Sequence, residues 1–122
     1  MYSEIVKDHA INPRNRREMK NPDLIGEGKY PRCGDKIKLF LRMQGESIAE
    51  ASFTASSCGP AVAAASLATT LVEGLTLAEA RDVLVHRLPK ILLDLPLSKR
   101  HAILLVLECL AEILEHNTHK NF

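Results

Sequence analysis

Thr54-Ala-Ser-Ser-Cys58-Gly-Pro-Ala-Val-Ala-Ala-Ala-Ser66-Leu67 joins the end of an alternating, strand-like segment to a helix rich in small residues. Gly59 and Pro60 stand where the helix begins, because proline has no N–H and is favoured in the first helical turn. Cys58 therefore lies at the strand-to-helix junction, beside unpaired N–H groups and the positive end of the helix dipole. These surroundings favour the thiolate, the form that binds metal or attacks sulfur. Taken alone, Cys58 is more often a small buried cysteine that fills a turn.

Two alternating segments predict a β-hairpin before this junction. Residues 36–43 and 47–56 each alternate between apolar and polar side chains, and Gln44-Gly45-Glu46 separates them. Such alternation is typical of strands with one buried face, and a short glycine-containing turn between them indicates antiparallel pairing. The apolar positions expected on the buried face are Ile37, Leu39, Leu41, Met43, Ala49, Ala51, Phe53 and Ala55. That face must be covered, most naturally by the helices that follow.

Helical patterns flank the hairpin on both sides. Apolar spacing predicts a short first helix with His9 on its packing face, ending at Asn12-Pro13 because the residue before proline avoids the helical region. Residues 24–30 contain two glycines and fit only a weak or edge strand. Later helical segments are expected over residues 60–73, 89–93 and 99–115. A further helix is expected to start at the capping-box pattern that begins with Thr76. The predicted fold is α+β, a three-stranded antiparallel sheet with helices packed on one side.

Composition narrows the class of protein. The chain has 122 residues, 46% of them hydrophobic, and a formal net charge of +1, which predicts a single domain over residues 1–122. Balanced charge and 4% aromatic residues give no indication of a nucleic-acid surface. No apolar run reaches the length of a membrane span, and the charged N-terminus is not a signal peptide. Three widely separated cysteines favour a reducing compartment over a disulfide framework, which indicates a cytoplasmic protein.

Pro31-Arg-Cys33-Gly-Asp35 is a tight turn that carries a thiol and a carboxylate just before the hairpin. Antiparallel pairing brings the start of the first hairpin strand beside the end of the second, where Cys58 follows. Asp35 is expected to point the same way as Cys33, since strand side chains alternate. Two thiols and a carboxylate at one sheet edge suit zinc, or iron with sulfide. The CxxC pairs of common zinc fingers are absent, so the residues alone leave a structural role open.

Several separated motifs resemble one known family. Those of the candidate site, Cys33-Gly-Asp35 and Cys58-Gly-Pro-Ala followed by Ser66-Leu67, are similar to the NifU N-terminal or IscU-like iron–sulfur cluster assembly scaffolds. The family also has counterparts of residues 2–9, Asn12-Pro-Arg-Asn15, Leu95-Pro96 and Lys99-Arg-His101. The resemblance therefore covers nearly the whole chain, in order.

The resemblance implies a scaffold on which a [2Fe–2S] cluster is built and passed to acceptor apo-proteins, and not an enzyme. A cysteine desulfurase would supply sulfur as a persulfide, and zinc would occupy the same site when no cluster is present. The implied ligands of cluster, iron or zinc are Cys33, Asp35, Cys58 and His101. Residues 95–99 match the loop that an Hsp70-type chaperone grips in IscU proteins, although Leu-Pro-Leu-Ser-Lys stands here in place of Leu-Pro-Pro-Val-Lys.

One position departs from the family pattern. The family has its third cysteine directly after the position of His101, where this chain has Ala102. Cys109 follows on the same expected helix about 10 Å farther along the axis, whereas a zinc–sulfur bond spans about 2.3 Å. Cys109 therefore cannot replace the missing ligand, and its apolar neighbours predict a core thiol. Any sulfur transfer would have to use Cys33 or Cys58.

Two other functions stay open. One is a zinc-dependent sulfur-acceptor partner of a cysteine desulfurase, although such relatives usually have a longer segment between the second and third cysteine positions and a basic residue in place of His101. The other is a degenerate homologue that acts as a regulatory or interaction module. From the residues alone, His101 is as readily a surface residue as a ligand, and the resemblance favours the ligand. The basic run of Arg14, Arg16, Arg17 and Lys20 is more often solvated than a docking site.

Overall fold

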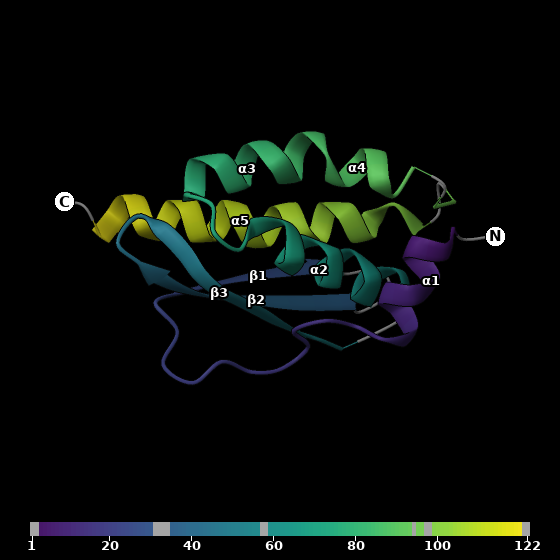
Figure 1. The fold of residues 1–122 in the computed structure, drawn as a ribbon, viewed down its shortest axis with the longest axis horizontal. Helices are drawn as coiled ribbons and strands as arrows, with labels where there is room; N and C mark the ends of the chain where they lie inside the picture. Colours follow the sequence, from purple (N-terminus) through teal and green to yellow (C-terminus); the bar gives the residue numbers. More distant parts are fainter. Residues whose placement is uncertain (1–2, 31–34, 57–58, 94, 97–98, 121–122) are drawn as a thin grey trace.

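The structure is a computed structural model that describes residues 3–30, 35–56, 59–93, 95–96 and 99–120. Its strands form one antiparallel sheet in the order β1-β2-β3. The elements are α1 (Glu4–Ile11), β1 (Leu24–Tyr30), β2 (Asp35–Gln44), β3 (Ser47–Ala55), α2 (Gly59–Val72), α3 (Leu77–His86), α4 (Leu88–Ile91) and α5 (His101–Lys120). Figure 1 shows α2, α3, α4 and α5 on the same side of the sheet. The predicted α+β fold, with helices packed on one side, is confirmed.

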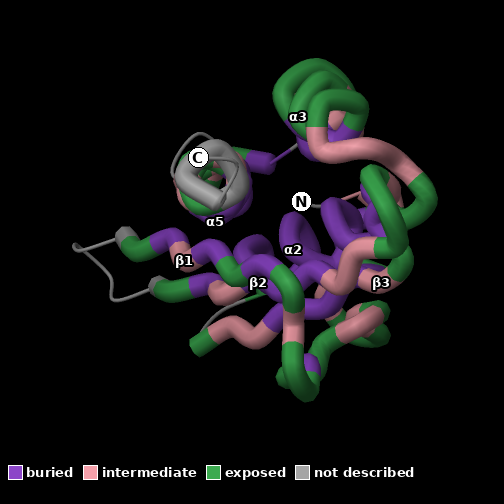
Figure 2. The backbone as a smooth tube through the Cα atoms, turned by 90° about the vertical axis from the view of Figure 1, so that its left-hand side faces the viewer, coloured by how far each residue is buried: buried purple, intermediate pink, exposed green. Residues whose placement is uncertain are grey.

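The helices form two layers over the sheet. α2 and α5 cover the strands, and α3 packs outside α2 (Figure 2). Residues 60–69 of α2 are all buried, and half of them are alanine, so this helix packs into the core along its whole first half. Close packing of small side chains holds the beginning of α2 at a fixed place relative to β2 and β3.

Two glycines explain how α5 lies against the edge strand β1. A Cβ atom at Gly26 would overlap the carbonyl oxygen of Cys109, and one at Gly28 would overlap the carbonyl oxygen of Leu105. Glycine permits this close approach because it has no side chain. The same residues that weaken the strand pattern in the sequence therefore allow the helix to sit directly on the strand.

A β-bulge in the pairing of β2 with β3 changes which residues face the core. Arg42 pairs with Glu50, but Met43 pairs with Ile48, so Ala49 is an extra residue on β3. A bulge interrupts the alternation, and consequently Ile48 is buried while Ala49 is exposed. The expectation of a buried Ala49 is therefore wrong. The other expected positions are buried or half-buried: Ile37, Leu39, Leu41, Met43, Ala51, Phe53 and Ala55.

The helix limits follow their sequence signals, except at the ends of α5. Thr76 and Glu79 form the predicted capping box of α3, and α1 ends with Asn12 as its C-cap. α5 begins at His101 rather than at residue 99 and continues to Lys120 rather than ending at 115. Once a helix is nucleated, each further residue adds a hydrogen bond, so a polar tail can extend it. Within the described residues, no helix combines the length and apolar character needed to cross a membrane.

The face of the sheet opposite the helices is partly covered by residues 12–23. The Phe53 N–H donates to the Asn15 carbonyl oxygen at 2.9 Å, and the Arg42 guanidinium donates to the Lys20 carbonyl oxygen at 2.7 Å. Met19 of this segment is buried, although it lies outside the main core cluster. The segment therefore covers the part of this face where β2 ends.

Candidate metal centre

The strand ends that flank the candidate ligands lie side by side. The N–H of Ser56, just after β3, donates to the carbonyl oxygen of Lys36 near the start of β2 at 3.0 Å. β1 ends directly opposite Asp35, the first residue of β2. The chain segments that contain Cys33 and Cys58 therefore leave the sheet at the same end, as the antiparallel pairing predicts. Cys33 and Cys58 themselves lie outside the described residues, and so does the side chain of Asp35.

α5 brings His101 to the same end of the sheet. The helix follows β1, with the Leu105 carbonyl against Gly28 and the Glu108 carboxylate accepting the Lys29 N–H at 3.3 Å. His101 is the first residue of α5, one turn before Leu105, and so lies toward the end of β1. Figure 1 shows this end of α5 on the side of the molecule where the strands β1 and β2 meet the grey trace. The half-buried His101 is thus placed near the segments that carry both cysteines.

The start of α5 is held by the arginine that precedes it. The Arg100 guanidinium donates to the carbonyl oxygens of Leu93 at 2.9 Å and Leu95 at 3.2 Å, and Leu95 is buried. These bonds tie the loop after α4 to the first turn of α5. Of the loop implied as a chaperone contact, the structure describes residues 95–96 and 99, so that contact stays a prediction.

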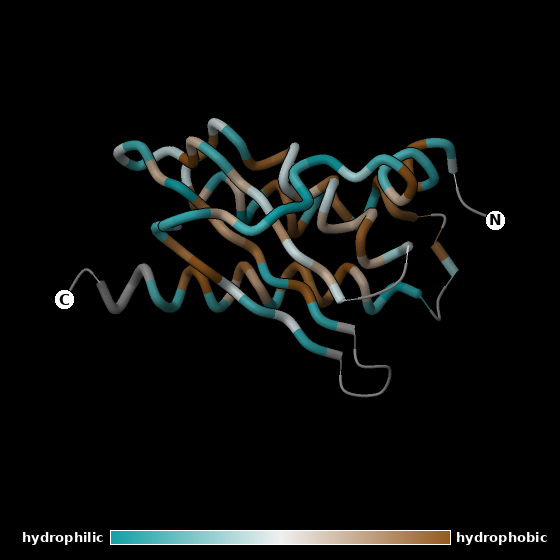
Figure 3. Tube along the Cα trace, turned by 90° about the horizontal axis from the view of Figure 1, so that it is seen from below, coloured by the Kyte–Doolittle hydropathy of each residue, from teal (hydrophilic) through white to brown (hydrophobic). Residues whose placement is uncertain are grey.

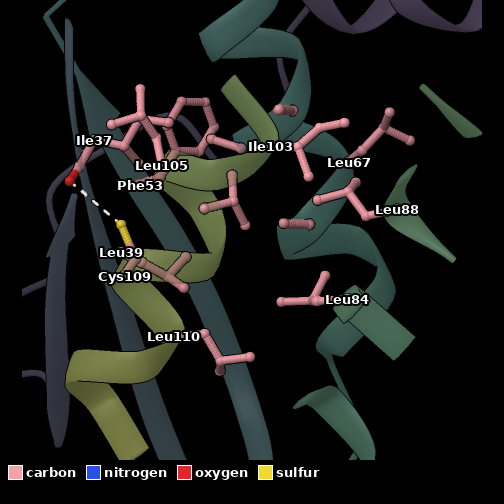
Figure 4. Packing of buried hydrophobic residues seen from close by; sticks show 14 of the residues in the cluster. Ile37, Leu39, Phe53, Leu67, Leu84, Leu88, Ile103, Leu105, Cys109 and Leu110 are labelled. Carbon is pink, nitrogen blue, oxygen red and sulfur yellow. Dashed lines mark hydrogen bonds between the residues drawn. The ribbon is translucent and has the colours of Figure 1, made fainter. Parts of the chain in front are cut away.

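Cys109 is a core thiol, as its neighbours in the sequence predict. Its side chain is completely buried, and the thiol donates to the carbonyl oxygen of Ile37 in β2 at 3.4 Å (Figure 4). Burial, with the nearby carboxylates of Glu112, Glu108 and Glu27, raises the pKa of Cys109 to about 12. The thiol therefore stays protonated at neutral pH and is a poor nucleophile and metal ligand.

Ala102, at the position of the family's third cysteine, also belongs to the core. Its exposed fraction is 0%, and it packs within the same buried cluster as Leu105 and Val106. A methyl group offers no lone pair to a metal, so this helix contributes only the imidazole of His101 to the predicted ligand set.

His9 packs against α2 and takes no part in the candidate metal centre. Its Nδ1 lies 2.7 Å from the Ser66 hydroxyl, which also accepts the Arg14 N–H at 2.8 Å. Burial, with the positive charge of Arg14, lowers the pKa of His9 and favours the neutral imidazole. The prediction that His9 belongs to a packing face is confirmed, and Ser66, like Thr69, which accepts from the Asn15 amide at 3.1 Å, helps join the N-terminal segment to α2.

The buried thiol of Cys109 should make the stability of the protein pH-dependent above pH 9. The ordinary thiol pKa is 9.0, and the folded value is about 12, so between these values the unfolded chain releases a proton that the folded chain keeps. A raised pKa stabilises the fold fully only below the unfolded value and is lost as the pH rises. From pH 8 to pH 10, the wild-type free energy of unfolding should fall by about 1.4 kcal/mol more than that of Cys109→Ala.

Urea denaturation of both proteins at the two pH values measures this difference. Cys109→Ala should be less stable than wild type at pH 8 because it leaves a small cavity, and the gap should narrow at pH 10. Equal losses in the two proteins would mean that the thiol is not buried in a protonated form.

No group of three or more His, Cys, Asp or Glu side chains is arranged to hold a metal ion within the part of the chain whose side chains the structure describes. Of the predicted ligands, only His101 has a described side chain, and the ligand set stays a prediction. The described residues that flank these ligands, Tyr30, Lys36 and Ser56, nevertheless lie at one end of the sheet. The sequence does not predict the roles of Arg100 and Lys36. Arg100 holds the loop after α4 through its guanidinium, and Lys36 acts through its backbone carbonyl, and neither interaction has a sequence pattern of its own.

Comparisons with solved structures agree with this fold. FiSufU from the thermophile Fervidobacterium islandicum AW-1 superposes with a TM-score of 0.75 at 20% sequence identity, over 93% of this chain and 96% of that one. The N-terminal part of a nitrogen-fixing NifU-like protein from Brucella abortus gives a TM-score of 0.65 at 18% identity, over 93% and 94% of the two chains.

Relatives found by sequence identify the family to which the chain belongs. Iron-sulfur cluster assembly scaffold protein IscU 1 of Archaeoglobus fulgidus is 31% identical over 121 residues, which are 99% of this chain and 79% of that protein. The IscU scaffold protein of Escherichia coli K12 is 43% identical over 86 residues, covering 67% of each chain. The family model described as the NifU-like N terminal domain matches this chain over residues 1–122. The chain therefore belongs to the NifU-like N-terminal domain family.

Proposed function

We propose that this protein is a scaffold that binds iron and sulfide as a [2Fe–2S] cluster and hands the cluster to acceptor apo-proteins. The relatives named as iron-sulfur cluster assembly scaffolds support this role, and so does the fold. The observation that supports the proposal is the Ser56 N–H to Lys36 carbonyl bond, which joins the residues shortly before Cys58 and shortly after Cys33. The half-buried His101, one turn before the Leu105 that lies against Gly28, begins α5 toward the same end of the sheet.

The proposed ligands are Cys33, Asp35, Cys58 and His101. Thiolate, carboxylate and imidazole groups suit zinc as well as iron–sulfur clusters, and we propose that zinc or iron binds here when no cluster is present. The N-terminus of α2 begins at Gly59, so its dipole would favour the thiolate form of Cys58. Asp35 would supply an oxygen ligand, which binds a soft metal less firmly than a third thiolate and suits a cluster that must be released.

The partners follow from this role. A scaffold without substrate turnover needs a sulfur donor, for which we propose a cysteine desulfurase, and an apo-protein that accepts the cluster. An Hsp70-type chaperone that recognises residues 95–99 is a further proposed partner. The buried Leu95 and its bond to Arg100 would have to loosen before a chaperone could bind this loop in extended form.

Anaerobic reconstitution with ferrous iron and sulfide, followed by visible absorption spectroscopy, tests the proposal. We expect a chromophore that survives desalting and is transferred to an apo-ferredoxin added afterwards. His101→Ala should form the same chromophore more weakly and lose it faster, whereas His86→Ala, at an exposed position of α3, should behave as wild type. A colourless protein that holds one tight zinc ion and stimulates a desulfurase would instead identify a sulfur acceptor. A protein that holds neither would be a regulatory module.

A further inference from the structure

The face of the sheet opposite the helices carries an excess of positive charge beside the candidate metal centre. Lys29 of β1 lies directly across from Lys36 of β2, and Lys38 lies across from Glu27. Glu27 is shared between two of these cations, at 3.5 Å from the Lys29 ammonium and 3.4 Å from that of Lys36. Arg16 borders the group, because its guanidinium donates to the Ala55 carbonyl oxygen at 3.3 Å. We call Arg16, Lys29, Lys36 and Lys38 the basic strand-end patch.

Among the side chains that the structure describes, positive charge exceeds negative charge in this patch. Glu27 can neutralise one positive charge, and neither Lys38 nor Arg16 forms an ion pair with a side chain that the structure describes, a set that leaves out Asp35. Like charges directly opposite each other in a sheet destabilise it, so the Lys29–Lys36 pair works against folding. At the other end of β2 the Glu50 carboxylate is likewise shared, between Arg42 at 3.2 Å and Arg17. Of the four cations in the patch, Lys29 and Lys36 share Glu27, and Lys38 and Arg16 have no ion pair with a described side chain.

A shallow depression lies within the patch. It has a volume of about 240 Å³ and is lined by Lys36, Lys38, Thr54, Ala55 and Ser56. Two ammonium groups and two hydroxyls are donors that suit a carboxylate. Figure 3 shows that the ends of β1 and β2 are hydrophilic where they approach the grey trace. The depression is thus on the same strand ends that bring the cysteine-bearing segments together.

We propose that the basic strand-end patch docks an acidic, extended segment of a protein partner that works at the candidate metal centre. Only the identity of that partner rests on the proposed function. Lys36 and Lys38 are two residues apart on one strand, and alternate residues of a strand are about 7 Å apart. A Glu-x-Glu segment in extended form has the same spacing, so both carboxylates reach an ammonium group together.

The small size of the patch favours a protein over a nucleic acid. Polyanion binding depends on many cations along a backbone, whereas this patch has four and the chain has a formal net charge of +1. Two of the other three cations of residues 12–23 are engaged in the fold: Arg14 pairs with Asp8 at 2.6 Å, and Arg17 pairs with Glu50. A short acidic segment matches the charge and the length of the patch.

A titration of the ¹⁵N-labelled protein with a decapeptide of alternating glutamate and serine tests the docking site by NMR. We expect amide shifts concentrated at residues 36–38 and 54–56, and no shifts there with the same peptide carrying glutamine. Reversal of two charges in K36E/K38E should weaken binding about tenfold or more, since each exposed pair contributes roughly 0.2–1 kcal/mol. The matched control R81E/K90E reverses two exposed cations on the helical side and should bind as wild type.

The outcomes separate this proposal from its alternatives. Shifts with the glutamine peptide, equal weakening by the control variant, or equal binding of a single-stranded DNA oligonucleotide would each overturn it. If K36E/K38E does not fold, K36Q/K38Q should still weaken binding about threefold or more. Cluster reconstitution is an independent readout: K36E/K38E should form the wild-type chromophore. A wild-type protein that binds the peptide but forms no chromophore would refute the proposed function and leave the docking site intact.

Discussion

Cys33→Ala and Cys58→Ala are each expected to lose zinc affinity about a hundredfold or more and to form no stable iron–sulfur chromophore. Structural zinc sites are worth about 10–16 kcal/mol, which divided over four ligands is roughly 3 kcal/mol for each. A loss of 1.4 kcal/mol is about tenfold in affinity, so one thiolate ligand accounts for about two decades. Competition with a chromophoric zinc chelator measures the affinity, and iron analysis after reconstitution measures the cluster.

Cys109→Ala is the matched control for these two variants. Its thiol is buried, donates to the Ile37 carbonyl and has a pKa of about 12, so removing it should leave zinc affinity unchanged. Unchanged metal content in both Cys33→Ala and Cys58→Ala would contradict the ligand assignment. Loss of metal in Cys109→Ala, with metal retained in the other two variants, would show that Cys109 is a metal ligand. That result would contradict its place in the core.

Gly26→Ala is expected to lower the free energy of unfolding by about 3 kcal/mol or more. A Cβ at this position would overlap the Cys109 carbonyl oxygen and lie 2.8 Å from its carbonyl carbon and from Cγ1 of Ile113. A backbone carbonyl cannot rotate away as a side chain does, so α5 would have to move off β1. Urea denaturation followed by circular dichroism measures the loss.

Gly59→Ala is a suitable control for stability because the added Cβ atom would make only an ordinary van der Waals contact. Its Cβ would lie 3.7 Å from that of Ala10, a normal van der Waals distance. Its stability should stay within about 1 kcal/mol of wild type. Equal stability of Gly26→Ala and wild type would mean that α5 does not lie on β1 as described. Because α5 also carries His101, a displaced helix should weaken metal binding as well.

The sequence predicts most of the sheet because alternation directly reports a buried face. Ile37, Leu39 and Leu41 are buried as expected. The alternation fails at Ala49, where a bulge adds one residue and moves Ile48 to the core instead. A bulge inserts a residue without changing the kind of residues around it, so the pattern of polar and apolar side chains does not reveal it.

Some features of the candidate site can also be predicted from the sequence, and others cannot. Antiparallel pairing alone predicts that the segments of Cys33 and Cys58 meet, and the Ser56–Lys36 bond agrees with this. The core role of Cys109 also follows from its apolar neighbours. The basic strand-end patch cannot be predicted from the sequence, because its cations come from the segment before β1 and from two strands. Only the register of the sheet brings them together.

We propose that Cys33 and Cys58 bind one metal ion together and that Cys109 does not bind it. Zinc K-edge X-ray absorption of the protein with one zinc ion per chain counts the ligands directly. The account predicts two sulfur ligands at about 2.3 Å, with the remaining positions filled by nitrogen and oxygen. A spectrum with fewer than two sulfur ligands, or with a third from Cys109, would contradict it.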